Sequence, residues 1–116
     1  MLRGEIWWAS LRFPRGSEPG FRRPVVIVQA DEFNRSDIST IIVAAISSNL
    51  HLGEAPGNIY LKRRESGLPK DSVINISQLL TLDKKYLSEK AGRLSPRHVL
   101  EMEESLRLVL SIGRGV

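Results

Sequence analysis

The sequence predicts an α+β fold that is mainly β, namely a small antiparallel sheet closed toward a barrel and followed by one long C-terminal helix. Three observations predict it. Short runs of branched and aromatic residues recur along most of the chain, turn-forming residues separate them, and a helical pattern with both ends marked occurs only at the end. Because 116 residues suffice for one core, we expect a single domain over residues 1–116.

The first half of the chain carries three predicted strands. Glu5–Arg12 mixes aromatic and branched residues without helical spacing, and the breaker-rich residues 13–20 after it predict a loop. Pro24–Gln29 begins at a proline, where the missing N–H costs least, and should be buried on both faces. Residues 31–37 favour a helical turn or a loop, and Ser39–Ile46 favours another buried strand.

The second half continues the pattern as far as one further long strand. Polar residues 47–57 predict a long loop, residues 58–62 a short strand and residues 63–71 a charged turn. Ser72–Leu80 should be a strand, and residues 81–87 favour one short turn of helix. Along this strand apolar and polar residues alternate between the two faces: Ile74 and Ile76, against Asn75 and Ser77.

The last segment has the signals of an amphipathic helix. Ser95 suits the N-cap, Pro96 the first helical position, and Gly113 the left-handed position after the helix. Apolar residues recur between them at a spacing of mostly three and four, which puts them on one face: Val99, Met102, Leu106, Val109 and Leu110. This face must pack on the sheet.

Composition excludes several kinds of chemistry. The chain has no cysteine, so disulfides and thiolate zinc sites are excluded. It has two widely separated histidines, His51 and His98, and no glycine-rich phosphate loop, so we expect neither a metal nor another cofactor. No segment is typical of a secretory signal or a membrane span, so we expect a cytoplasmic protein. A net charge of +4 favours polyanions or acidic protein segments as partners.

Polar residues gather at the ends of the central predicted strands. Glu18, Arg22 and Arg23 precede Pro24–Gln29, and the strand ends of a small barrel can converge on one rim. Three more polar residues fall at such positions: Ser47, Ser48 and Gln78. Arginine suits phosphate because its planar fork donates two parallel hydrogen bonds. Spacing alone nevertheless favours ordinary structural roles, as solvated charges, turn residues and a glutamine that satisfies backbone groups.

Several motifs occur together in a distinctive order. They are GEIWW at 4–8, RGSEPGFRRPV at 15–25, VQADEFNRS at 28–36, VAAISS at 43–48, DSV at 71–73 and QLLTLDK at 78–84. In this order the chain resembles the MazF/PemK family of toxin endoribonucleases. The resemblance implies a homodimer of SH3-like β-barrels with peripheral helices. It also implies cleavage of single-stranded RNA at short motifs, without a metal, and neutralisation by an acidic antitoxin.

The resemblance also assigns residues. Arg23 falls on the catalytic arginine of the family, and Ser47 falls where many members carry threonine. Ser17 and Glu18 match the loop motif, and Gln78 matches a glutamine of the RNA-binding groove. With Arg22 and Ser48, we expect Ser17 and Gln78 to contact RNA. Glu18 is either the general base or the ion-pair partner that positions Arg22 or Arg23, and both roles stay open.

The implied reaction is attack of a ribose 2′-OH on the neighbouring phosphorus, which leaves a 2′,3′-cyclic phosphate and a 5′-OH. Arg23 would stabilise the charge on the pentavalent phosphorane, and Ser47 would hydrogen-bond a non-bridging oxygen. Two residues depart from the family pattern: Ser47 lacks the methyl group of threonine, and Leu80 stands where an arginine is common.

Two further points bear on function. Trp7 and Trp8 should alternate across the first strand, so one ring packs inward and the outer one is available to a base or, as we favour, to a dimer interface. The main alternative function is that of a CcdB-like toxin, which acts by binding gyrase. The C-terminal Trp-Gly-Ile element of those toxins is missing here. A catalytically impaired RNA-binding relative is the other alternative.

Overall fold

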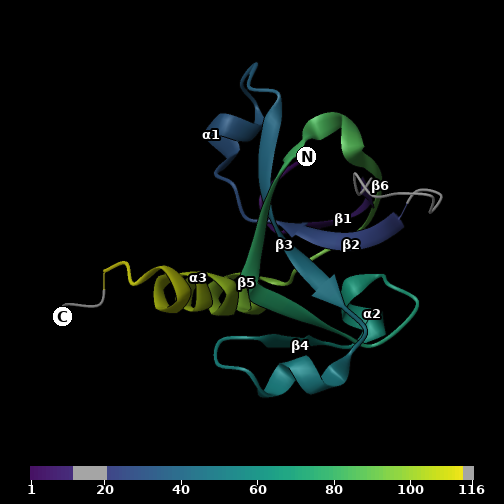
Figure 1. Ribbon diagram of the computed structural model, residues 1–116, viewed down its shortest axis with the longest axis vertical. Coiled ribbons are helices and arrows are strands. Elements are labelled where there is room, and N and C mark those ends of the chain that lie inside the picture. The colour runs from purple at the N-terminus through teal and green to yellow at the C-terminus, as the bar shows by residue number, and fades with distance from the viewer. Residues whose placement is uncertain (12–20, 114–116) are drawn as a thin grey trace.

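Six strands of the computed structural model form one antiparallel sheet in the order β4-β5-β3-β2-β1-β6, which curls into a partly open barrel (Figure 1). The structure describes residues 1–11 and 21–113. The strands are β1 (Glu5–Leu11), β2 (Phe21–Ile27), β3 (Thr40–Ser47), β4 (Ile59–Leu61), β5 (Ser72–Asp83) and β6 (Leu87–Arg93). The helices are α1 (Asp31–Asn34), η1 (Leu50–Glu54), α2 (Arg63–Ser66), η2 (Lys84–Tyr86) and α3 (Pro96–Leu110). The predicted fold class is therefore confirmed.

Strand pairing explains why two strands are longer than predicted. β2 begins at Phe21, ahead of the expected Pro24, because its antiparallel ladder with β1 extends to the pair Leu11 and Phe21. β5 continues to Asp83 because its ladder with β3 extends to Thr40. Both extensions come from the partner strand and leave no signal in the local sequence.

The strand β6 was not predicted. Its sequence LSEKAGR is rich in residues that are poor strand formers, and it forms an edge of the sheet by pairing with β1. The short helix expected over residues 81–87 is correct only for Lys84–Tyr86, where the carboxylate of Asp83 accepts a hydrogen bond from Lys85 N.

Two segments predicted as loop or turn contain short helices. In residues 47–57, the side chain of Asn49 accepts the backbone N–H of His51 and starts the 3₁₀ helix η1. In residues 63–71, the helix α2 forms one turn and ends at Gly67, whose φ is +77°. The expected helical turn at residues 31–37 is confirmed as α1.

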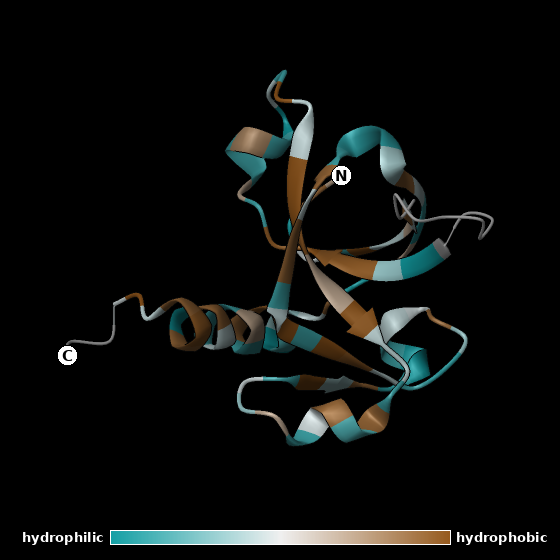
Figure 2. Cartoon of the chain, viewed as in Figure 1, coloured by the Kyte–Doolittle hydropathy of each residue, from teal (hydrophilic) through white to brown (hydrophobic). Residues whose placement is uncertain are grey.

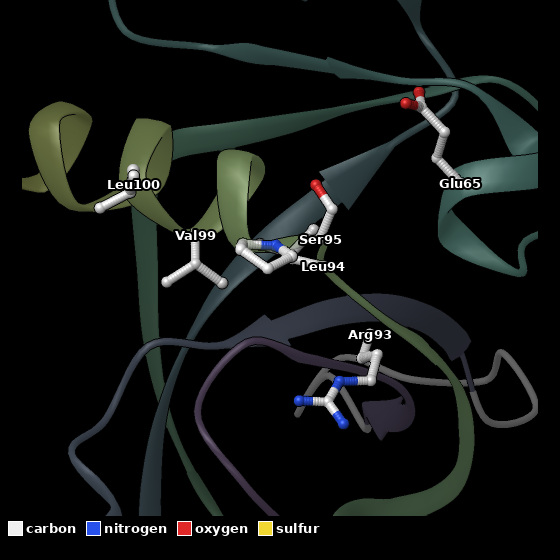
Figure 3. Close-up of a pocket in the computed structure, with 7 residues that line it drawn as sticks. Glu65, Arg93, Leu94, Ser95, Val99 and Leu100 are labelled. Carbon is white, nitrogen blue, oxygen red and sulfur yellow. The ribbon is translucent and has the colours of Figure 1, made fainter.

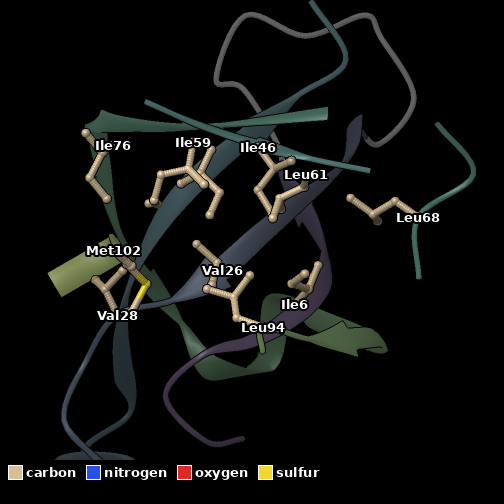
Figure 4. Close-up of a cluster of buried hydrophobic side chains, with 12 residues drawn as sticks. Ile6, Val26, Val28, Ile46, Ile59, Leu61, Leu68, Ile76, Leu94 and Met102 are labelled. Atoms are coloured by element: carbon tan, nitrogen blue, oxygen red, sulfur yellow. The ribbon is translucent and has the colours of Figure 1, made fainter. Parts of the chain in front are cut away.

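Buried side chains form two groups on opposite faces of the strands. The helix-side core, drawn in Figure 4, comprises Ile6, Val26, Val28, Ala44, Ile46, Ile59, Leu61, Leu68, Ile74, Ile76, Leu94 and Met102. The second core comprises Ala9, Val25, Ile27, Ile41, Val43 and Leu87. Figure 2 shows hydrophobic stretches along β2 and β3. Burial of β2 on both faces is therefore confirmed. Trp8 packs on the helix-side core and Trp7 on the second core, so neither ring is simply outward.

The helix α3 starts as predicted and ends differently. Ser95 is the N-cap, and its Oγ accepts the N–H of His98 at 3.2 Å. The C-cap is Ser111, with φ 55°, and Gly113, two residues later, also takes a left-handed φ of +66°. Met102 is fully buried, and Leu106 and Val109 pack against the helix-side core, but Leu110, expected on the same face, is 49% exposed because it lies about 80° around the helix from Met102.

β4 and β6 are the two edge strands of the sheet, and a close contact between α2 and β6 narrows the gap between them. A Cβ on Gly67 would lie 2.1 Å from the carbonyl oxygen of Ala91, and a Cβ on Gly92 would lie 2.3 Å from that of Ser66. Only glycine allows the two backbones to approach so closely. This contact connects the segment that follows β4 to β6, and it helps the open barrel keep its shape. Within the described residues, no helix is both long and apolar enough to cross a membrane.

Candidate active site

A cavity of about 260 Å³ lies at the open end of the second core and collects three of the predicted site residues. It is lined by Leu11, Arg23, Pro24, Val25, Ala45, Ile46, Ser47, Leu52, Gln78 and Leu80. Arg23, Ser47 and Gln78 come from β2, β3 and β5, and they are far apart in the sequence. The convergence of strand ends expected from the sequence therefore occurs.

The end of the ladder between β2 and β3 brings Arg23 and Ser47 together. Pairing of these antiparallel strands ends at Val25 and Ala45. Two residues farther along each strand, on the same face, come Arg23 and Ser47, and a continued register would set them opposite each other. Val25 and Ala45 line the inner part of the cavity, so the guanidinium and the hydroxyl belong to its outer part.

A bulge in β5 presents Gln78. The register with β3 changes from the pair Ala44 and Leu79 to the pair Ala45 and Asn75, so Ile76, Ser77 and Gln78 have no partner in β3. Such a bulge bends the strand and redirects its side chains. Its effect here is to bring Gln78 to the same cavity as residues of β2 and β3.

A chain of amide side chains holds the bulge in place. Asn75 Nδ2 donates to Gln78 Oε1 at 3.2 Å, and Asn58 Nδ2 donates to Asn75 Oδ1 at 3.2 Å. Asn58 also accepts the N–H of Ile76 at 3.0 Å and donates to the carbonyl oxygen of Leu52 at 2.7 Å. The oxygen of Gln78 is thus engaged, and its amide N–H groups are what it offers to a ligand.

The hydroxyl of Ser47 has a defined orientation. Its Oγ accepts the backbone N–H of Asn49 at 3.1 Å, which leaves the hydroxyl proton available to a ligand. Arg23 is exposed, and it is the one charged residue among the described residues that line the cavity. Apolar walls such as Leu11 and Leu80 lower the local dielectric and strengthen the effect of this cation on an anion. The site can therefore bind a phosphate.

Two predicted RNA-binding residues lie beside this cavity and not in it. Ser48 lines a neighbouring cavity of about 210 Å³ together with Trp8, Pro24, Leu68, Pro69, Lys70 and Ser72. Arg22 projects from the opposite face of β2 to Arg23. Its guanidinium lies 4.7 Å from the centroid of the Trp8 ring and forms an ion pair with Glu89 of β6. Ser17 and Glu18 lie outside the described residues.

The residues that support the site were not predicted from the sequence. Asn58 holds both the bulge and η1, but in the sequence it is only the first residue of the short strand predicted over residues 58–62. Leu11 and Leu52 form walls of the cavity from distant parts of the chain. Leu80, which stands where an arginine is common in the family, contributes an apolar wall and packs against the second core.

A larger cavity, about 790 Å³, lies between α2, the end of β6 and the start of α3 (Figure 3). It is lined mainly by apolar groups, including Leu94, Val99 and Leu100. Its two charged side chains, Glu65 and Arg93, come from different elements and extend in different directions in Figure 3. It does not gather polar groups in the way that the cavity at Arg23 does. In the described part of the chain, no three His, Asp or Glu side chains form a metal-binding group.

Comparison with known proteins agrees with the sequence motifs. The model of the family "PemK-like, MazF-like toxin of type II toxin-antitoxin system" matches residues 2–110. The chain is 41% identical over 110 residues to endoribonuclease MazF6 of Mycobacterium tuberculosis H37Rv, covering 95% of this chain and 96% of that protein.

Solved structures share the fold. A MazE–MazF crystal structure (Form-II) from Deinococcus radiodurans superposes with a TM-score of 0.81 at 18% identity, covering 97% of each chain. An endoribonuclease in complex with its cognate antitoxin from a mycobacterial species superposes with a TM-score of 0.78 at 18% identity, covering 97% of this chain and 96% of that one. The chain therefore belongs to the MazF/PemK family of toxin endoribonucleases of type II toxin–antitoxin systems.

Proposed function

We propose that this protein cleaves single-stranded RNA at a short sequence motif, without a metal, in the cavity lined by Arg23, Ser47 and Gln78. The observation that carries the proposal is their convergence from three strands on one cavity with apolar walls. An always-charged guanidinium, an oriented hydroxyl and an amide form a set of donors suited to a phosphodiester.

The proposed reaction is a transesterification within the RNA. The 2′-oxygen attacks the adjacent phosphorus as its proton passes to a base, and the bond from phosphorus to the 5′-oxygen breaks as that oxygen gains a proton. The products are a 2′,3′-cyclic phosphate and a 5′-OH. Arg23 stabilises the added negative charge on the phosphorane, and Ser47 donates its hydroxyl proton to a non-bridging oxygen. Gln78 holds the RNA through its amide N–H groups.

The general base stays a prediction. Glu18, which lies outside the described residues, is proposed either to accept the 2′-OH proton or to position an arginine, and Ser17 beside it to contact RNA. A pH–rate profile separates the two roles. If Glu18 is the base, the rate falls at low pH as the carboxylate is protonated, and this fall disappears in Glu18→Gln. If Glu18 only positions an arginine, Glu18→Gln is slower but the fall at low pH remains.

We also propose that an acidic antitoxin neutralises the toxin. The net charge of +4 supports this, because a basic surface attracts acidic protein segments as well as RNA. The similar solved structure from a mycobacterial species, which contains an endoribonuclease with its cognate antitoxin, adds support.

The test is incubation of purified protein with a long RNA in EDTA, followed by mapping of the ends. We expect cyclic-phosphate ends at one repeated motif. Arg23→Ala should fold and cleave roughly 10² to 10³ times more slowly, because it loses a donor to the transition state. Arg64→Ala is the matched control, since Arg64 is exposed on α2 and does not line the cavity. Intact RNA, or full cleavage by Arg23→Ala, would contradict the proposal.

A further inference from the structure

The neighbouring cavity of about 210 Å³ continues directly from the candidate active site. Pro24 lines both cavities, and Ser48 of this one follows Ser47 of the other. Since consecutive Cα atoms are about 3.8 Å apart, the two cavities meet at the rim formed by the start of β2 and the end of β3. An RNA whose phosphate lies at Arg23 can therefore extend over this rim to the second cavity.

The size of this cavity suits one base. Its volume is below the roughly 300 Å³ at which sites for drug-sized ligands begin, so it accommodates a single base and not a stack of several. Trp8, Leu68 and Pro69 provide its apolar surfaces. Aromatic side chains stack on bases that have left their own stack, as happens in single-stranded RNA.

Trp8 is fixed before any ligand arrives. The ring packs against the helix-side core, and the guanidinium of Arg22 lies over one of its faces, 4.7 Å from the centroid, so a base stacks on the other face or takes the place of Arg22. Arg22 is itself held by its ion pair with Glu89. Because these contacts already restrict the indole, little conformational freedom is lost when a base stacks on it.

Among the described residues that line the cavity, Lys70 is the charged donor, and the hydroxyl of Ser72 can only accept from a ligand because its proton is already donated. Lys70 is exposed and its ammonium group can only donate. The hydroxyl of Ser72 already donates to the carbonyl oxygen of Lys70 at 3.0 Å, which fixes the backbone there, and the exposed Ser48 adds a hydroxyl. A donor that faces C4 of a pyrimidine or C6 of a purine favours uracil and guanine, which carry a carbonyl oxygen there. Adenine and cytosine present an amino group at the corresponding position.

We propose that this cavity binds one base that flanks the scissile phosphate, stacked on Trp8, and that Lys70 makes it prefer uracil or guanine. The proposal rests on the function proposed above for the adjacent cavity. It deepens that function by assigning a determinant of the cleavage motif to residues outside the reacting centre.

The experiment uses short single-stranded RNAs that differ only in the base on either side of the cleaved bond. At one of the two positions, we expect kcat/KM to be at least about tenfold higher for RNAs with uracil or guanine than for RNAs with adenine or cytosine. A factor of this size is expected for one hydrogen bond to a charged group. Lys70→Met should reduce this ratio to below about threefold. Arg64→Met removes the same charge from an exposed residue outside the cavity and should keep the ratio.

A second pair of variants tests the stacking. Trp8→Leu should lower kcat/KM about tenfold or more for all four bases, whereas Trp8→Phe retains a ring and most of the rate. Thermal unfolding of each variant shows that the fold is kept. Equal loss in Trp8→Phe and Trp8→Leu, with Tm unchanged, would overturn the stacking.

Binding to RNAs with a 2′-deoxy group at the cleavage position, measured by fluorescence anisotropy, separates the two proposals. If no RNA is cleaved but binding shows a base preference that Lys70→Met removes, the base cavity stands and the catalytic proposal fails. If RNA is cleaved but wild type and Lys70→Met respond alike to the base at both positions, the base cavity is wrong and the catalytic proposal stands.

Discussion

At the scale of the residue, Ser47 shows how a hydroxyl without the methyl group of threonine can still be held. In the family many members carry threonine here, and its branched Cβ restricts χ1. In this chain the N–H of Asn49 donates to the Oγ of Ser47 at 3.1 Å. The backbone thus supplies the orientation that the missing methyl group would otherwise help to provide.

Substitution of Ser47 tests this interpretation. Ser47→Thr should keep single-turnover RNA cleavage within about threefold of the original rate, because the hydroxyl and its backbone donor remain. Ser47→Ala should lose roughly 10² to 10³ in rate, as expected for removal of one donor to the transition state. If Ser47→Ala cleaves as fast as Ser47→Thr, the hydroxyl has no part in the chemistry.

Glu5 is a buried carboxylate that stabilises the start of β1. Burial tends to raise its pKa, but hydrogen bonds from Leu2 N, Trp7 Nε1 and Lys90, with the charge of Lys90, outweigh it and lower the pKa to about 2. A carboxyl whose pKa is lower in the folded state contributes stability above its unfolded value of 4.5 and loses it as the pH falls toward 2.

The pH dependence of unfolding measures this contribution. From the shift, we expect Glu5→Gln to be less stable than wild type by roughly 3 kcal/mol at pH 7, and the difference to shrink between about pH 4.5 and pH 2. Urea unfolding of both proteins from pH 7 to pH 2.5 gives the difference directly. Glu89→Gln, at an exposed ion pair, should show no comparable change. A difference that is constant with pH would contradict the assignment.

At the scale of the element, α3 shows that apolar residues at helical spacing are not all buried. Met102 is fully buried in the helix-side core, whereas Leu110, two turns later on the predicted face, is 49% exposed. Leu110 instead lines a shallow cavity with Arg3, Glu103 and Ile112. Val109, one residue earlier, still packs against the helix-side core, so the exposure of Leu110 comes from its position at the edge of the apolar face and not from the length of the helix.

Alanine substitutions should reveal the difference. Met102→Ala should cost about 2 to 5 kcal/mol in the free energy of unfolding, because it removes buried methylene groups and leaves a cavity. Leu110→Ala should change it by less than about 0.5 kcal/mol, as at other exposed positions. Denaturant unfolding of the two variants checks this, and a large loss in Leu110→Ala would mean that this end of the helix is covered in solution.

At the scale of the whole molecule, we propose that two copies form a homodimer. Several large apolar side chains of the described chain are exposed, among them Phe33 at 54%, Ile38 at 43% and Leu100 at 65%. Scattered exposed apolar residues are ordinary, so the proposal rests on the family resemblance, and these side chains are candidates for the interface.

Sedimentation equilibrium tests the proposal. The chain has a mass of 13.0 kDa, and we expect twice that mass at micromolar concentration. If apolar contacts hold the dimer, the mass should persist in 1 M salt, where charge interactions are screened to about 3 Å. A mass of one chain at every concentration would exclude the homodimer.

Local signals in the sequence predicted most elements, and the candidate catalytic residues were assigned through the family that the motifs indicate. Alternating Ile74 and Ile76 marked a strand, Ser95 and Pro96 marked the start of α3, and the motifs around Arg23 and Ser47 indicated the family. These features can be predicted because each depends on residues that are close in the chain. The face of a strand on which a side chain lies, the hydrogen bond of a helix cap and the order of residues in a motif are all local properties.

The arrangement of the site depended on contacts between distant residues, which only the tertiary structure shows. The edge strand β6 forms because β1 pairs with it, although its own residues are poor strand formers. Gln78 reaches the cavity because β5 bulges where Asn58 holds it, and Trp8 is fixed by Arg22 and a core from many strands. The sequence by itself determined the family, the main elements and the chemistry of the donors. Register, bulge and packing decided which donors share a cavity, because pairing between distant strands has no local signature.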